Sequence, residues 1–182
     1  APSVTTIAPS VTTIAPIVTT PPTTLAPLSP NLVLEIDTTL SPEVAPGSLS
    51  SSVADFVYEL GLFGVGNVHI DWGDNKSDDV TVARAYAHTY VTSGQYTITV
   101  SGTLTGFGQE FGAQNVLRGA EYLTAVLSFG DIGIENLSNA FWGANNLIKV
   151  PRSLPATVTS MKAMFSGASK FDQPIGGWKT GE

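Results

Sequence analysis

The two histidines are the first side chains to consider as catalysts. His69 lies beside Asp71 in a stretch that alternates apolar and polar residues, and His88 opens the segment His-Thr-Tyr. A catalytic histidine needs a nucleophile and an orienting group within hydrogen-bond reach. The sequence contains no Gly-x-Ser-x-Gly turn, and no spacing links either histidine to a serine. We therefore expect structural roles for both histidines.

A group of aspartates is the second candidate, and the chemistry that it suggests is calcium binding. The group consists of Asp71, Asp74, Asp78 and Asp79. Ca²⁺ takes several carboxylate and carbonyl oxygens as ligands, but this spacing does not match the loop of an EF-hand. Calcium stays an alternative, and we expect no cofactor.

Four further acids could in principle serve a glycosidase, which needs two carboxyl groups about 5–10 Å apart across a cleft. Glu110, Glu121, Asp131 and Glu135 lie in or beside the C-terminal repeats described below, but nothing marks any pair as buried or opposed. Metal-ligand, phosphate-binding and dinucleotide-binding motifs are missing from the sequence. We expect a protein that is not an enzyme.

Trp142 is the best candidate for contact with a partner. It stands where two other copies of the C-terminal repeat carry Arg118 and Ser166, at a position that we expect to be exposed. An exposed tryptophan tends to be used in binding, because its large apolar ring is costly to leave in water. We predict that Trp142→Ser leaves the fold intact and weakens binding.

Composition excludes several classes of function. Of the 182 residues, 13% are charged, against a usual share of about 25%, and the net charge is −7. Only eight Lys and Arg residues are present, so nucleic acid and anionic membranes are not expected as partners. Cysteine is absent, which excludes disulfides and thiolate metal sites. No apolar run reaches the roughly 18 residues of a membrane span.

Residues 1–30 form a low-complexity segment rich in Pro and Thr. The sequence Ala-Pro-Ser-Val-Thr-Thr-Ile at residues 1–7 recurs at 8–14 and, more loosely, from residue 15. Proline in every repeat and paired β-branched threonines oppose a helix, so we expect an extended stalk. Composition alone is typical of a flexible linker. We nevertheless infer that this stalk is an arm held by other structural chains in an oligomeric assembly.

The segment 31–106 is expected to be all β. Apolar and polar residues alternate in its candidate strands, and Gly-containing turns separate them. Strands are predicted over 31–38, 53–60, 68–72 and 96–100, with turns at 46–47, 64–67, 73–75 and 93–94. Short strands with regular turns and no helical stretch favour a β-sandwich.

Three motifs in this segment occur in order: residues 68–74 (Val-His-Ile-Asp-Trp-Gly-Asp), residues 88–90 (His-Thr-Tyr) and residues 94–100 (Gly-Gln-Tyr-Thr-Ile-Thr-Val). Together they resemble the polycystic-kidney-disease (PKD) domain family, with Asn75 in place of a usual glycine. The resemblance implies an immunoglobulin-like sandwich with Trp72 in its core. It also implies that the aspartates tie the turn, and that the domain is a spacer or interaction module.

The segment 107–182 contains a repeat of 24 residues. The pattern apolar-x-Gly-Ala occurs three times at equal spacing, starting at Leu117, Phe141 and Phe165. A period in the twenties is typical of leucine-rich repeats, in which each unit is one coil of a solenoid. Met161, Met164 and Phe165 are spaced as one face of a short helix.

Residues 161–178 resemble the BspA-type leucine-rich repeat of bacterial surface lipoproteins and some phage proteins, with Asp172 where the family usually has Asn. The resemblance implies that Trp178 fills the interior of a coil. The next coil should begin after Trp178, so we expect either that the natural chain continues or that another subunit covers the open end.

These observations predict a mainly β protein with short helices, organised as a stalk (1–30), a PKD-like sandwich (31–106) and about three coils of a leucine-rich solenoid (107–182). We expect a non-enzymatic structural or adhesive protein at a virion surface, as a phage fibre or decoration component whose repeats bind a host-surface protein or glycan. A bacterial cell-surface adhesin and a glycan-binding module of a larger secreted enzyme are the alternatives.

Overall fold

The computed structural model describes residues 29–40, 56–109 and 116–180. The expected stalk therefore lies almost entirely outside the described residues, as do the predicted turn at 46–47 and Glu110. The fold is mainly β, as expected, and its only helices in the described part are two short 3-10 turns. The elements are β1 (Leu32–Asp37), η1 (Thr38–Leu40), β2 (Phe56–Asp71), β3 (Ser77–Val80), β4 (Arg84–Tyr90), β5 (Gln95–Phe107), η2 (Ala120–Tyr122) and β6 (Leu123–Phe129).

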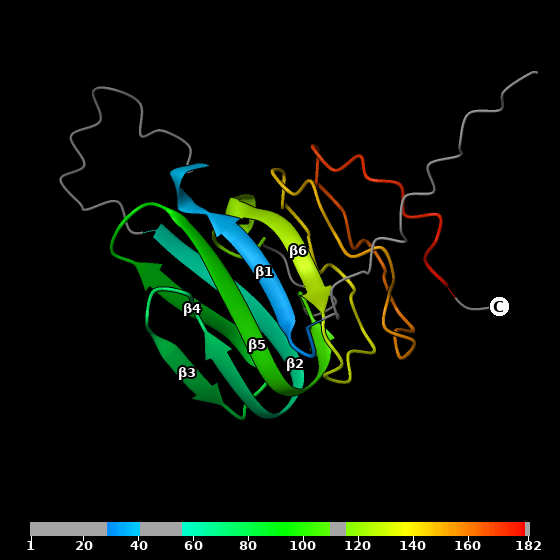
Figure 1. The fold of residues 1–182 in the computed structure, drawn as a ribbon, viewed down its shortest axis with the longest axis horizontal. Helices are drawn as coiled ribbons and strands as arrows, with labels where there is room; N and C mark the ends of the chain where they lie inside the picture. The colour runs from blue at the N-terminus through cyan, green and yellow to red at the C-terminus, as the bar shows by residue number, and fades with distance from the viewer. Residues whose placement is uncertain (1–28, 41–55, 110–115, 181–182) are drawn as a thin grey trace, which may run out of the picture.

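The strands form one antiparallel sheet of six strands in the order β3-β2-β5-β1-β6, and β4 also pairs with β2 (Figure 1). Alternating apolar and polar residues produce this sheet, because neighbouring side chains of a strand point to opposite faces. In β1, for example, Leu32, Leu34 and Ile36 are buried and the residues between them are partly exposed.

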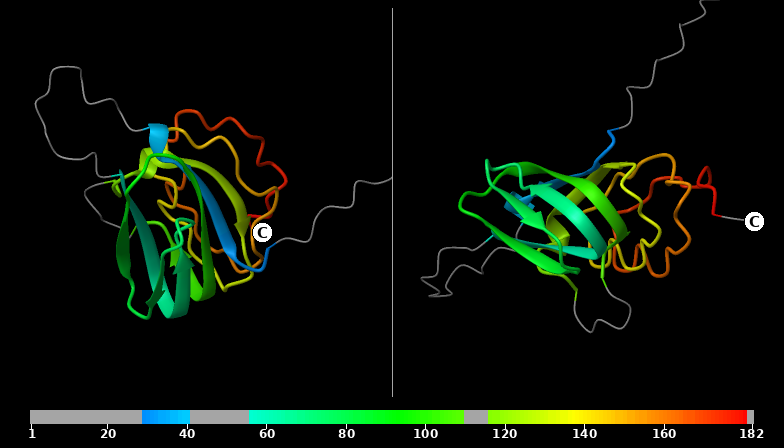
Figure 2. Two further views of the ribbon diagram at one scale, coloured as in Figure 1. Left: turned by 60° about the vertical axis from the view of Figure 1, so that its left-hand side comes forward. Right: turned by 90° about the horizontal axis from the view of Figure 1, so that it is seen from below.

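The turn predicted at 64–67 is wrong. β2 runs through it for 16 residues, and its pairing with β5 shifts register between Val65 and Val68. Gly64 has φ = 55°, and Gly102, opposite Val68, has φ = 108°. A glycine inside a strand can mark a bulge as well as a turn, and here it does. β2 consequently pairs with β4 through its first half and with β3 through its second, and the sheet curls (Figure 2).

The sheet and the C-terminal segment share one hydrophobic core. β6 lies beyond the expected boundary at 106/107, yet it pairs with β1 in the same sheet. The ring of Phe141 packs at centroid distances of 6.0 Å from Phe107 on β5, 6.4 Å from Phe129 on β6 and 5.5 Å from Phe165 in the last described coil. The core therefore continues from the sheet into the repeats.

The short helix expected over Met161–Phe165 does not form, and consecutive turns take its place. In the preceding unit, the N–H of Phe141 donates to the carbonyl of Met164 at 2.9 Å, whereas the N–H of Ala144 donates to the carbonyl of Phe141 at 3.1 Å. An α-helix would direct these N–H groups to its own carbonyls. In these turns every second backbone N–H donates to a carbonyl of the neighbouring coil, and a continuous α-helix therefore does not form.

The spacing of these contacts follows the sequence repeat. Isolated parallel bridges join Ala125 to Lys149 and Asn136 to Ser160, each pair 24 positions apart. The glycines of the three copies have φ values between 74° and 78°, in the left-handed region; they are Gly119, Gly143 and Gly167. No helix among the described residues is long and apolar enough to cross a membrane.

Candidate functional site

The turn that follows β2 is built around Trp72, which is fully buried. Its indole Nε1 donates to Asp78 Oδ2 at 2.7 Å, and its carbonyl accepts from the hydroxyl of Tyr90 at 2.9 Å. The ring of His88 stacks on the indole at a centroid distance of 4.8 Å, with 8° between the planes. The motifs at 68–74 and 88–90 therefore meet in space.

His88 is buried and its Nε2 lies 3.0 Å from Asp74 Oδ2. Lys76 Nζ lies 3.4 Å from the same oxygen, and the Lys76 N–H donates to Asp74 Oδ1. Burial by itself raises the pKa of Asp74, but the hydrogen bond and charge of His88, together with Lys76, outweigh it and hold the pKa below 3.8. The Asp74 carboxylate is thus stabilised in its ionised form by the fold.

The four aspartates of the calcium hypothesis each face a different group. Asp71 accepts from the N–H of Gly73, Asp78 from the Trp72 indole, and Asp79 is bonded to His69. Among the described residues no group of three or more His, Asp or Glu side chains converges in a way that could hold a metal ion. The carboxylates serve here as ties within and between strands.

His69 lies on the exposed face of the sheet, where its Nδ1 is 2.8 Å from Asp79 Oδ1. Its partner on the other side is Ser101 of β5, so that Asp79, His69 and Ser101 form a row across three strands. No spacing in the sequence indicates this row, because strand pairing alone creates it. In the described part of the chain no hydrogen bond joins His69 to Ser101, so the row lacks the nucleophile–base contact of a triad.

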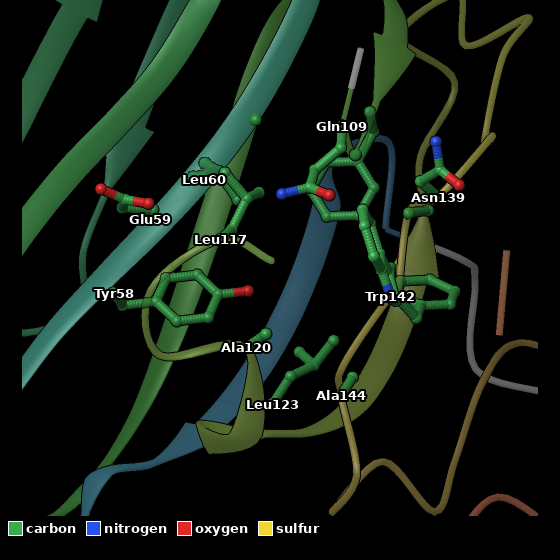
Figure 3. Close-up of a pocket in the computed structure, with 15 residues that line it drawn as sticks. Tyr58, Glu59, Leu60, Gln109, Leu117, Ala120, Leu123, Asn139, Trp142 and Ala144 are labelled. Atoms are coloured by element: carbon green, nitrogen blue, oxygen red, sulfur yellow. The ribbon is translucent and has the colours of Figure 1, made fainter. Parts of the chain in front are cut away.

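Trp142 is half-buried, not exposed as predicted. It lines a narrow cavity between β2, the end of β5 and the repeats (Figure 3). The first repeat copy packs against β2, where the N–H of Glu59 donates to the carbonyl of Arg118 at 2.9 Å. The sheet consequently covers part of the second copy. Alignment of the three copies could not show this, since Arg118 and Ser166 are themselves exposed.

The cavity has a volume of about 20 Å³, which is room for about one water molecule. Drug-sized ligands and cofactors occupy roughly 300–1,000 Å³, so this cavity does not hold one. Tyr58 points its hydroxyl into the space (Figure 3), and burial raises the pKa of its phenol above the usual 10. The other residues that line it include Leu60, Phe107, Gln109, Leu117, Leu123, Asn139 and Phe141.

Polar side chains of the repeats connect one coil to the next. The amide of Gln173 donates to the carbonyl of Val150 and accepts from its N–H, both at 3.0 Å. Lys170 Nζ donates to Asn146 Oδ1 at 2.6 Å. Trp178, buried as the resemblance implied, donates from its indole to the carbonyl of Pro151. These groups act in the stacking of the coils.

The acids considered for glycosidase chemistry are not brought together in the described structure. Asp131 and Glu135 are exposed on the repeats, and Glu121 is half-buried. Asp131 lines a shallow cleft with Ser128 and Pro151, and neither Glu121 nor Glu135 belongs to that cleft.

The described fold is therefore that of a mainly β protein whose sheet continues into stacked turns. Residues 114–182 match the model of a family described as Mycoplasma protein of unknown function, DUF285. No curated protein and no solved structure matches the chain.

Proposed function

We propose that the protein is a non-enzymatic structural or adhesive component displayed at a surface, and that the surface is that of a phage particle. The observation that carries the proposal is the single core, which joins the sheet to the repeats through Phe141. Such a body is suited to holding a broad surface rigid. The two histidines and the aspartates around the turn after β2 are bonded to neighbouring groups of the sheet.

The finer assignments belong to this proposal. A PKD-like sandwich is supported by the packing of Trp72, His88 and Tyr90 around the turn at 73–75. A leucine-rich solenoid is supported by two bridges at 24-residue spacing and by backbone hydrogen bonds between residues 23 to 25 positions apart. In this proposal the N-terminal arm contacts other structural chains, and the repeats contact a protein or glycan on the host.

Electron microscopy with gold-labelled antibodies against the folded part of the chain tests the proposal on native particles and on cells. Labelling of particle surfaces is the expected result. Labelling of cell envelopes alone would favour the bacterial adhesin. A soluble secreted pool that copurifies with glycan hydrolysis would favour the glycan-binding module of a larger enzyme and contradict our proposal.

Trp142 remains our proposed partner contact, but its variant needs a new control. Because the indole lines the junction cavity, Trp142→Ser should lower the stability by about 1–3 kcal/mol, and binding must be measured well below the melting temperature. Ser166→Ala changes the equivalent, exposed position of the next copy and should leave stability unchanged. Binding that Trp142→Ser retains in full would remove the indole from the contact.

A further inference from the structure

β4 is an edge strand that pairs only with β2 in the described sheet, and it lies on the side of the sheet away from the repeats (Figure 1). Two bonds of β2 show how the β2–β4 ladder is oriented. The N–H of Glu59 donates to the carbonyl of Arg118 at 2.9 Å, and the carbonyl of Gly61 accepts from the N–H of Gly108 at 3.0 Å. Both groups therefore point away from β4, so Glu59 and Gly61 form non-hydrogen-bonded pairs with the residues opposite them.

The β4 residues opposite Glu59 and Gly61 are Ala87 and Ala85. In a non-hydrogen-bonded pair, each residue directs its N–H and its carbonyl away from the other strand. Alternation along β4 adds Thr89 to this outward set. Among the described residues, no backbone hydrogen bond reaches Ala85, Ala87 or Thr89 from outside the sheet. The side chains of these three residues are small and exposed. We call their backbone groups the free edge.

The free edge lacks the protection that sheet edges usually carry, which is a charged side chain, a proline or a very short strand. β3 has this protection, because it is four residues long and includes Asp78 and Asp79. β4 is seven residues long, and Arg84 at its first position is its only Lys, Arg, Asp, Glu or Pro. The contrast between the two edges indicates that β4 is a pairing surface.

Exposed apolar side chains lie at both ends of β4. Val82, two residues before the strand, is 61% exposed, and Val91, immediately after it, is 76% exposed. A single exposed valine needs no explanation, but two that flank one unprotected edge restrict what can cover it. The matching occupant is an extended segment of the same length with an apolar residue at each end. β4 and its flanking valines are themselves such a segment.

We propose that β4 of one copy pairs antiparallel with β4 of a second copy, with the two-fold axis at Ala87. In this register Ala87 lies opposite Ala87 of the second copy, and Ala85 lies opposite Thr89. Every N–H of the free edge then meets a carbonyl of the other free edge, which gives about six hydrogen bonds between the copies. Both strands bring donors and acceptors, as in other cases of strand addition to a sheet edge.

The same register brings the exposed valines together. Val91 of the second copy lies opposite Ala83, and thus next to Val82, at each end of the paired strands. The contact is isologous, so it closes with two copies and leaves no further edge of the same kind. This inference goes beyond the proposed function, since it assigns a surface and a partner that the display role does not require.

Sedimentation and light scattering of the full chain, over a series of protein concentrations, test the association. The expected result is a mass that rises to that of two chains and stops there. NaCl should have little effect, because backbone hydrogen bonds and valines form the contact and ion pairs do not. A mass that stays at one chain, or that grows beyond two, overturns the proposal.

Hydrogen exchange locates the contact within β4. The N–H groups of Ala85, Ala87 and Thr89 should exchange slowly in the dimer and rapidly in a dilute sample. Those of Tyr86 and His88 point towards β2 and should exchange slowly in both samples, which makes them the internal control. Slow exchange of the first three groups in the dilute monomer overturns the proposal, because another segment of the same chain would then cover the free edge.

Two variants of Ala87 separate association from folding. Ala87→Pro removes an N–H that β2 does not use, and proline is tolerated at such edge positions, so the monomer should fold. Ala87→Lys places two like charges opposite each other across the axis. Each variant should raise the dissociation constant of the dimer roughly tenfold or more. Far-UV circular dichroism of dilute samples checks the fold, and Ala87→Lys keeps the test open if the proline variant does not fold.

Ala156→Lys is the matched control, because it makes the same change at an exposed alanine of the repeats. It should leave the dissociation constant as in the parent. Equal dissociation constants for Ala87→Lys and Ala156→Lys overturn the proposal. None of these results bears on the labelling of native particles, so failure of this inference and failure of the proposed function are distinguishable.

Discussion

His88 and Asp74 lie 3.0 Å apart, Nε2 to Oδ2, although 14 positions separate them in the sequence. The turn after β2 brings the carboxylate to the imidazole, and the indole of Trp72 covers the ring from one side. This contact fixes the turn on β4, so two motifs of the sequence act as one structural unit.

The stability of the protein should depend on pH through Asp74. The pKa of Asp74 is lowered in the fold below 3.8, so its contribution is fully present above the unfolded value and is lost as pH falls through the folded pKa. Unfolding free energies measured by urea titration between about pH 2 and 6 should therefore fall at the acid end. Asp74→Asn should cost about 1–2 kcal/mol at pH 6 and flatten the acid limb. An acid limb as steep in Asp74→Asn as in the parent would assign it to other groups.

Alanine at the repeat glycines should destabilise the protein to different degrees. Gly143 has φ = 78°, and a Cβ there would lie 2.4 Å from Val116 Cγ1. Gly167 has φ = 75°, but its Cβ would meet nothing closer than 3.4 Å. Gly167→Ala should cost about 1–2 kcal/mol for the left-handed backbone, and Gly143→Ala should cost more, since the clash adds to the strain.

Gly176→Ala is the control in this series, because a Cβ at Gly176 meets nothing within 4 Å and its φ is not positive. Thermal melting should rank the variants with Gly176→Ala nearest the parent and Gly143→Ala lowest. A Gly167→Ala variant as stable as Gly176→Ala would argue against the turn geometry of the last coil.

Gln173 should contribute to stability through its two hydrogen bonds to Val150. Gln173→Ala removes both hydrogen bonds and leaves the buried main-chain N–H and carbonyl of Val150 without this side-chain partner, at a cost of about 1–3 kcal/mol. Gln95→Ala removes an exposed amide that bonds Asp37 and should change stability by less than about 0.5 kcal/mol. Equal denaturation midpoints for the two variants would show that Gln173 does not hold the coils together.

The sheet and the repeats should unfold in one transition, because they share the core around Phe141. Trp72 lies in the sheet and Trp178 in the last coil, and unfolding of one protein followed by tryptophan fluorescence and by far-UV circular dichroism should give the same midpoint. Phe141→Ala should lower both midpoints together, with a loss of about 3–5 kcal/mol. Two separate midpoints would show that the segments fold independently.

Local patterns in the sequence determined much of the fold. Alternation of apolar and polar residues marked β1 and the middle of β5, and turn residues marked the ends of strands at 73–75 and 93–94. The 24-residue spacing of Gly119, Gly143 and Gly167 anticipated three equivalent left-handed positions. These features can be predicted from the sequence because alternating burial along a strand and a positive φ each restrict which residue types can occur at a position.

Tertiary structure decided what depends on contacts between distant segments. The glycines at 64 and 66 are compatible with a turn and with a bulge, and pairing with β5 selected the bulge. Met161, Met164 and Phe165 have helical spacing, but hydrogen bonds from the neighbouring coil drew the backbone into turns. The partial burial of Trp142 and the pairing of His69 with Asp79 likewise arise from strand order and packing of the sheet on the repeats, which no local pattern encodes.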